Sequence, residues 1–142
     1  MITFTRSALL PAPVEKVFAY VSDPAKIPEW RKDVPEITQV SGPTAVGTTF
    51  LEGVRFMGRK QLLMKVIEFV PNQKLVIQAQ GGMALLPTQS FTFQAVGNQT
   101  RVNLQVEMRV SGLFRLMAFA LPGQLQKIWT RYFENLGRIL AA

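Results

Sequence analysis

Polar and apolar residues alternate strictly over residues 90–94 and 102–109, and this pattern limits the fold more than any other feature of the chain. In the first stretch, Phe91 and Phe93 alternate with polar residues. In the second, four apolar residues alternate with four polar ones: Val102, Leu104, Val106 and Met108 against Asn103, Gln105, Glu107 and Arg109. A period of two is typical of strands with one buried and one wet face. Another part of the chain must therefore cover one side of an antiparallel sheet.

The segment from Leu125 onward has the pattern expected of that cover. At about 100° per residue, its apolar side chains fill an arc of about 140° over roughly five helical turns. These residues are Leu125, Ile128, Trp129, Tyr132, Phe133, Leu136, Ile139 and Leu140. Pro122 and Gly123 break or start this helix, and the preceding LFRLMAFAL is apolar nearly all round. We expect the long amphipathic helix to pack on the sheet.

Residues 1–30 predict one strand followed by two short helices. Residues 1–10 alternate well enough for a strand, and residues 13–21 have helical spacing after Pro13. In DPAKIPEW, residues 23–30, Asp23 suits an N-cap, and Pro28 prevents a long helix before Trp30.

Turn signals then separate a meander of strands. We expect these strands at residues 48–57, 59–70, 74–80, 88–96 and 100–110. The chain is therefore predicted to be a single α+β domain over residues 1–142, with an antiparallel sheet against a long C-terminal helix and two short helices after the first strand.

The absence of histidine and cysteine excludes several kinds of chemistry. A Ser-His-Asp triad, a thiolate nucleophile and an imidazole metal site are all impossible. The sequence also contains no Walker loop and no GxGxxG motif. We therefore expect no metal and no cofactor.

Charge and targeting signals limit the partners and the location. The net charge is +7, and residues 37–142 carry eleven basic and four acidic residues, whereas residues 1–36 carry five of each. Basic surfaces attract nucleic acid or anionic membrane. Because the basic residues are scattered, apart from Arg59 and Lys60, nucleic acid is not an expected partner. With no signal peptide evident, the cytoplasm is the expected location.

The order of these elements resembles the START-related, birch-pollen-allergen-like and polyketide-cyclase/dehydrase superfamily, often called SRPBCC. The resemblance is carried by APVEKVFAYVSDPAKIPEW, VGTTF, VIEFVPNQKLVIQ and NQTRVNL, and it spans about residues 3–140. It implies a helix-grip fold, in which a curved sheet wraps around the long helix and leaves a cavity between them. It implies function less specifically, because the superfamily includes lipid and hormone binders, aromatase-cyclases, ubiquinone-binding proteins and chaperone activators.

From this resemblance we expect a hydrophobic small-molecule ligand, such as a lipid, a polyketide or an isoprenoid-like compound. The candidate lining residues are apolar and are distributed over the sheet and the long helix: Trp30, Phe56, Met64, Ile77, Phe91, Phe93, Leu104, Met108, Met117, Leu121, Leu125 and Trp129. Each of them could instead fill the core. For Trp30 in particular, lining the cavity and plugging the core are both open.

The segment QGGMALLP places apolar residues in what should be an exposed hairpin loop. Exposed apolar loops mark a ligand mouth, a partner site or a membrane contact. We interpret Met83, Leu85 and Leu86 as a gate to the cavity, and LFRLMAFAL as flanking the same entrance. The basic excess adds a second hypothesis, a transient contact with anionic membrane during ligand exchange.

Parity on the strand at residues 48–57 decides which charged residue enters the interior. If Phe50 and Val54 face inward, Glu52 does too; if Leu51 and Met57 do, Arg55 enters instead. An inward Glu52 could act as a general acid or base, because burial disfavours its charged form. The alternative is a Glu52 paired at the surface.

Three functions therefore remain open at this point. We favour a nonenzymatic binder or carrier. The alternatives are an enzyme similar to polyketide cyclases and dehydratases, with Glu52 as its carboxylate, and a protein-interaction module similar to chaperone activators.

Overall fold

A computed structural model describes residues 2–55, 59–81, 85–110, 112–117 and 119–142. The sheet contains β1 (Ile2–Leu10), β2 (Glu36–Thr38), β3 (Thr49–Arg55), β4 (Arg59–Val70), β5 (Lys74–Gln80), β6 (Leu85–Val96) and β7 (Gln99–Val110). The helical elements are α1 (Val14–Val21), η1 (Pro24–Lys26), α2 (Ile27–Trp30), η2 (Gly112–Met117) and α3 (Leu121–Ala141). This order confirms the predicted helix-grip fold.

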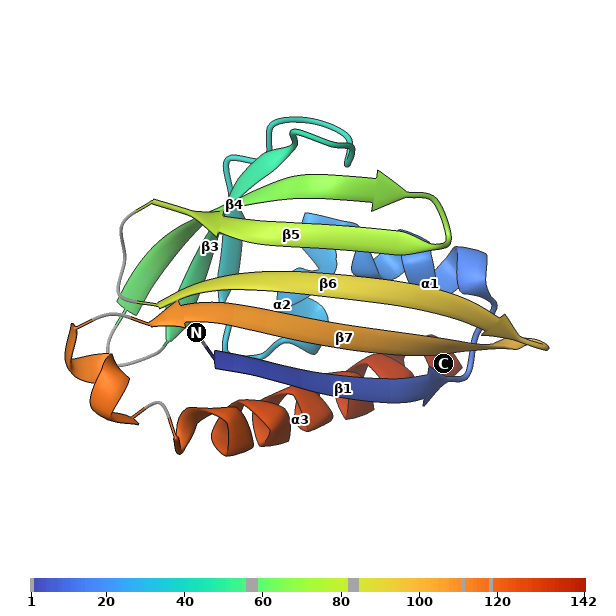
Figure 1. Ribbon diagram of the computed structural model, residues 1–142. Coiled ribbons are helices and arrows are strands. Elements are labelled where there is room, and N and C mark those ends of the chain that lie inside the picture. Colours follow the sequence, from blue (N-terminus) through green and yellow to red (C-terminus); the bar gives the residue numbers. More distant parts are fainter. Residues whose placement is uncertain (1, 56–58, 82–84, 111, 118) are drawn as a thin grey trace.

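The seven strands form one antiparallel sheet in the order β1-β7-β6-β5-β4-β3-β2. Strands β3 to β7 are neighbours in chain order, as a meander requires, and β1 pairs with β7 at one edge. The register of β4 and β5 shifts between Val66 and Glu68, an irregularity of the kind that bends a strand. Figure 1 shows the curved sheet with α1, α2 and α3 on one side of it.

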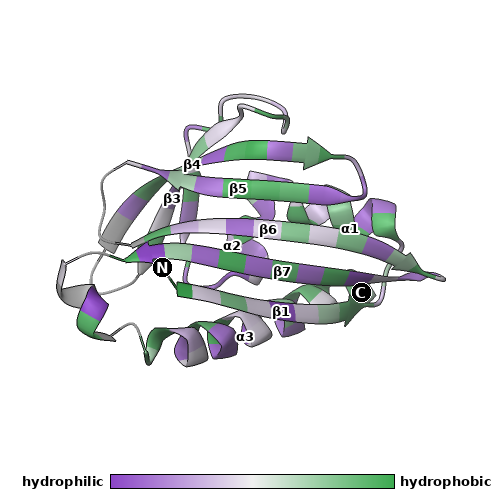
Figure 2. Cartoon of the chain, viewed as in Figure 1, coloured by the Kyte–Doolittle hydropathy of each residue, from purple (hydrophilic) through white to green (hydrophobic). Residues whose placement is uncertain are grey.

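The alternation in β7 sorts its side chains by face. Val102, Leu104, Val106 and Met108 are buried, whereas the residues between them are exposed. Figure 2 shows the same alternation of hydrophobic and hydrophilic residues along β7. The one-sided sheet predicted from this pattern is confirmed.

Helix α3 supplies the expected cover. It begins at Leu121, so Pro122 and Gly123 start the helix instead of breaking it, and Pro122 lies in the first turn, where a missing N–H removes no hydrogen bond. Trp129, Tyr132, Phe133, Leu136 and Leu140 of the predicted apolar stripe are buried. The other three stripe residues, Leu125, Ile128 and Ile139, are partly buried against the core.

The DPAKIPEW segment folds as two short turns. Asp23 Oδ1 accepts a hydrogen bond from the Ala25 backbone N–H at 3.0 Å, which confirms Asp23 as an N-cap. The chain leaves α2 directly after Trp30, and the Arg31 backbone N–H donates to the carbonyl of Ile27 at 2.8 Å. This bend places Trp30 and Arg31 against α3.

Two parts of the sheet differ from the sequence prediction. Strand β2 was not predicted, because three residues are too few to show an alternation. Strand β6 begins at Leu85, three residues before the predicted start at Thr88. Among the described residues, no helix has both the length and the apolar character needed to cross a membrane.

Candidate ligand site between the sheet and the long helix

Strand β3 carries Glu52 into the interior. Phe50 is 1% exposed and Glu52 is 2% exposed, and both lie on the same face of the strand because they are two residues apart. Glu52 pairs in register with Leu62 of β4 on one side and Ile37 of β2 on the other. Of the two parity alternatives, the structure therefore has Glu52 inward.

Arg31 meets Glu52 from the opposite side of the interior. Arg31 Nη1 donates to Glu52 Oε1 at 2.7 Å, and both residues are buried. The alternative of a Glu52 paired at the surface is therefore wrong, whereas the role of the inward Glu52 as a general acid or base stays a prediction. The observed arrangement is a buried ion pair, in which the guanidinium compensates the charge of the carboxylate.

Aromatic rings of α3 cover the guanidinium. Arg31 Cζ lies 5.0 Å from the centroid of the Trp129 ring and 5.3 Å from that of the Tyr132 ring. Both distances suit a cation–π interaction. The Tyr132 hydroxyl donates to Asp33 Oδ2 at 3.1 Å, and burial raises the pKa of Tyr132 to about 12. At neutral pH this phenol is therefore a hydrogen-bond donor.

Trp30 packs into the same group of rings. Its ring is stacked on Phe133, with 6.5 Å between centroids, and lies 6.0 Å from Trp129 and 6.3 Å from Tyr132. Its backbone carbonyl accepts a hydrogen bond from Asn135 Nδ2 at 3.4 Å. The polar pair is thus bordered by aromatic side chains of α2 and α3.

Two N–H groups of this cluster lack an acceptor among the residues that the structure describes. They are Trp30 Nε1 and Arg31 Nε, and both are buried. No sequence pattern indicates Arg31 as a site residue, because nothing local in the chain links it to a carboxylate 21 residues away.

A further interior polar residue was also missed. Gln89 is 4% exposed and lies in register with Ile77 on β5 and Val106 on β7. The signal was present in the sequence, because Gln89 has the same parity on its strand as Phe91 and Phe93.

Most of the predicted lining residues lie in two buried clusters. The larger contains Trp30, Met64, Ile77, Phe91, Phe93, Leu104 and Trp129. The smaller contains Ile2, Met108 and Leu121, and Leu125 packs against both. Phe56 lies outside the described residues, as does the side chain of Met117 in η2. That these residues contact a ligand stays a prediction.

The predicted gate is only partly described. Met83 lies outside the described residues, and Leu85 is the first residue of β6, with a side chain that is not described. Leu86 is 7% exposed and belongs to the larger core cluster. The prediction that Leu86 lies in an exposed loop is therefore wrong, because the strand starts earlier than the turn residues indicated.

The apolar segment before α3 does reach the surface. Leu116 is 75% exposed and Phe119 is 89% exposed, and together they are called the η2 patch below. Arg115 beside them is also exposed. Figure 1 shows η2 projecting beyond the sheet, at the end where α3 begins.

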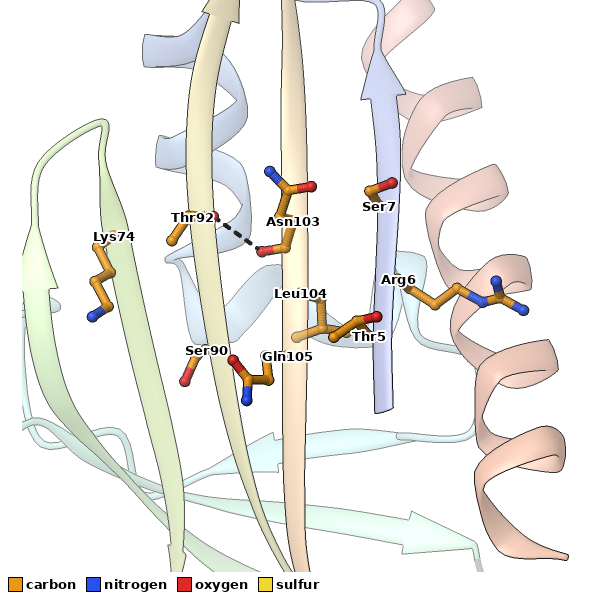
Figure 3. A pocket seen from close by; sticks show the side chains of 9 residues that line it. All are labelled: Thr5, Arg6, Ser7, Lys74, Ser90, Thr92, Asn103, Leu104 and Gln105. Carbon is orange, nitrogen blue, oxygen red and sulfur yellow. Dashed lines mark hydrogen bonds between the residues drawn. The ribbon is translucent and has the colours of Figure 1, made fainter. Parts of the chain in front are cut away.

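A polar groove of about 560 Å³ occupies the outer face of the sheet. It is lined mainly by hydroxyl and amide side chains of β1, β6 and β7, with Lys74 at one side. Figure 3 shows Thr92 bonded to Asn103 across two of these strands, while Arg6 points away toward α3. This groove lacks the apolar lining expected of the ligand cavity.

Comparison with known proteins agrees with this architecture. The family described as polyketide cyclase / dehydrase and lipid transport matches residues 1–140. No curated protein matches the sequence.

Several solved structures have the same fold. A START superfamily protein from Mycobacterium smegmatis has a TM-score of 0.81 at 16% identity, covering 97% of this chain and 98% of its own. A protein from Thermus thermophilus has a TM-score of 0.80 at 18% identity, covering 98% and 97%. The di-domain ARO/CYC StfQ of the steffimycin biosynthetic pathway has a TM-score of 0.79 at 12% identity, covering 96% of this chain and 49% of its own. At these identities the likeness shows the fold alone.

Proposed function

The chain belongs to the polyketide cyclase/dehydrase and lipid transport family, and from this premise we propose that it binds and carries a hydrophobic small molecule between α3 and the sheet. The ligand would be a lipid, a polyketide or an isoprenoid-like compound. It would lie among the buried apolar side chains, beside the Arg31–Glu52 pair.

The ion pair is the observation that carries this proposal. Removing two charges from water costs several kcal/mol per ion, and apolar residues of similar volume are often as good for stability or better. The Arg31–Glu52 pair, 2.7 Å long and buried, is therefore poorly explained by stability alone. The pair would instead orient a ligand that has a polar end, because fixed polar groups in an apolar site set the orientation of the bound molecule.

The η2 patch supports exchange of this ligand at an anionic membrane. Leu116 and Phe119 are the two most exposed large apolar residues among those that the structure describes, and they lie three residues apart. Exposed apolar residues that gather in one place mark sites of contact with a partner, a ligand or a membrane. Arg115 lies next to the patch in the sequence and is exposed. Lys127, Arg131 and Arg138 are exposed along α3, with Glu134 as the acidic residue among them. Apolar side chains with basic neighbours fit the surface of an anionic bilayer.

Native mass spectrometry tests the proposal directly. The protein purified from cells should retain an apolar molecule that organic solvent extracts. The double variant Arg31→Met/Glu52→Leu keeps the interior filled but removes the polar pair, so it should fold and retain much less of that molecule. If the wild-type protein carries no small molecule and binds none from a lipid extract, the proposal fails.

An enzyme remains the second candidate, because Glu52 lies inside with its charge compensated by Arg31. In that case Glu52 would accept or return a proton of the bound substrate. Glu52→Gln would then abolish turnover of a polyketide-like substrate at unchanged affinity. A pure carrier would show no turnover in either form of the protein.

A further inference from the structure

Two N–H donors beside the ion pair indicate which kind of ligand the interior accepts. Trp30 is 1% exposed and Arg31 is 7% exposed, and among the described residues neither Trp30 Nε1 nor Arg31 Nε has an acceptor. Buried donors are paired in the great majority of cases, because a donor removed from water and left unpaired destabilises the folded protein. A ligand oxygen would supply the missing acceptor.

The two donors belong to one small region. They come from consecutive residues, and both side chains lie against the same two rings of α3. Arg31 Cζ is 5.0 Å from the Trp129 centroid and 5.3 Å from the Tyr132 centroid, and the Trp30 ring is 6.0 Å and 6.3 Å from them. The side chains that carry the two donors therefore border the same aromatic cluster, formed by Trp129 and Tyr132.

The charge balance of the site selects among oxygen acceptors. Glu52 Oε1 lies 2.7 Å from Arg31 Nη1, so the guanidinium already has its counter-charge. A ligand carboxylate would add a second negative charge near Glu52 in an apolar interior, with no further cation to compensate it among the buried described residues. An uncharged oxygen needs no counter-charge.

We propose that the interior site takes an apolar molecule bearing an uncharged oxygen acceptor, such as a ketone or ester carbonyl, and that Trp30 Nε1 and Arg31 Nε donate to that oxygen. This inference rests on the proposed function of the same site. It assigns Trp30 to ligand binding, where the sequence left lining and plugging open.

Three naphthalene probes of similar shape, used at concentrations below their solubility limits, test the selectivity: 2-acetylnaphthalene, 2-isopropenylnaphthalene and 2-naphthoate. The first probe has a carbonyl oxygen where the second has a methylene group, and the third carries a carboxylate. By equilibrium dialysis, the ketone should bind about tenfold more tightly than the hydrocarbon, as expected when a buried donor gains a neutral acceptor. The carboxylate should bind more weakly than the ketone.

Matched variants identify the donor. Trp30→Phe removes an indole N–H and keeps an aromatic ring, so the preference for the ketone over the hydrocarbon should fall several-fold. Trp129→Phe makes the same chemical change in the same aromatic cluster, and it should alter the affinities for all three probes by a similar factor. Circular dichroism would establish that both variants are folded.

The outcomes separate this inference from the proposed function. If the hydrocarbon binds as tightly as the ketone, the interior binds apolar molecules but the two donors do not select them. Tightest binding of 2-naphthoate would show that the site takes anions and would overturn the charge argument. If a native ligand is retained and none of the probes displaces it, the acceptor proposal falls while ligand binding stands. If no probe binds and no ligand is retained, both proposals fall.

Discussion

Arg31 and Glu52 compensate each other's charge, so removing either one alone leaves an unpaired charge in the interior. We expect Glu52→Leu or Arg31→Met alone to lower the free energy of unfolding by about 3–5 kcal/mol. The double variant Arg31→Met/Glu52→Leu should be as stable as the wild type, or more stable by about 1–4 kcal/mol. Urea unfolding of the wild type, the two single variants and the double variant measures these free energies and completes a double-mutant cycle. Additive losses in the double variant would mean that the two residues do not act as a pair.

The two tyrosines give a pH signature. Burial raises the pKa of Tyr132 to about 12, and burial together with a 2.7 Å hydrogen bond to Glu29 raises the pKa of Tyr20 as well. Since an unperturbed tyrosine has a pKa near 10, ultraviolet absorbance of tyrosinate should appear at higher pH in the folded protein than in urea.

The same shift makes stability depend on pH. A raised pKa in the folded state gives a contribution that is complete below about pH 10 and is lost as the pH rises through about 12. Tyr132→Phe should therefore weaken the fall in unfolding free energy over this window. If the unfolding free energy of the variant decreases as steeply as that of the wild type over this pH range, other titrating groups cause the decrease.

At the scale of elements, the energetics of α3 depend on which face a residue occupies. Leu136 is fully buried, so Leu136→Ala should lower the free energy of unfolding by about 2–5 kcal/mol. Arg131 is exposed on the same helix, and Arg131→Ala should change it by less than about 0.5 kcal/mol. Denaturant titration of both variants checks the difference. Equal effects would contradict the packing of α3 on the sheet.

The start of β6 gives a second prediction. Leu86 is 7% exposed in the larger core cluster, so Leu86→Ala should destabilise the protein by about 2–5 kcal/mol, in the range expected for Phe91→Ala. Thermal unfolding measures this loss. If Leu86→Ala leaves the stability unchanged and speeds ligand release, Leu86 belongs to a gate and not to the core.

Elements whose information is local could be predicted from the sequence. The stripe of α3 and the alternation of β7 each repeat over several turns or residue pairs, and both define their buried faces correctly. The caps and prolines of residues 23–30 also predict the two short turns. Strand β2 has no such repeat, and β6 includes residues 85–87, which the sequence placed in the loop before the strand.

The candidate site was predictable only in part. Parity offered Glu52 or Arg55 as the inward residue, and the choice depends on how β3 pairs with β4, which is not a local property. The partner of Glu52 depends on how α2 is positioned by α3, so Arg31 could not be identified from spacing. Gln89 could have been identified, because it continues the buried parity of Phe91 and Phe93.

For the molecule as a whole, the proposed membrane contact can be tested at the η2 patch. Leu116→Ser/Phe119→Ser should weaken binding to vesicles of phosphatidylcholine and phosphatidylserine in a flotation assay, because burial of the two side chains in the interface is lost. Added salt should weaken the remaining attraction, since basic residues near an anionic surface contribute about 1 kcal/mol each.

Val46→Ser is the matched control for this surface. Val46 is an apolar residue that is 65% exposed in the segment before β3, away from the η2 patch in the sequence. Its replacement should leave vesicle binding unchanged. If Val46→Ser weakens flotation as much as the patch variant does, the contact is not specific to the η2 patch.

The position of α3 beside β1 has a consequence for aggregation. The sheet is open and has two edge strands, β1 and β2. Strand β2 is three residues long, follows Pro35 and precedes Gln39 with a positive φ of 54°, so it offers little backbone to another chain. Strand β1 is nine residues long, and α3 lies beside it, with Arg6 Nε donating to the carbonyl of Gln126 at 3.3 Å.

Detachment of α3 would therefore leave β1 as a long unpaired edge next to an uncovered apolar face. Strands of other molecules can add to such an edge, and the outcome of losing the helix is then intermolecular pairing instead of a reversible local opening. Heating should accordingly give aggregation that rises with protein concentration, and variants that loosen α3 should show it at lower temperature than variants that loosen β2.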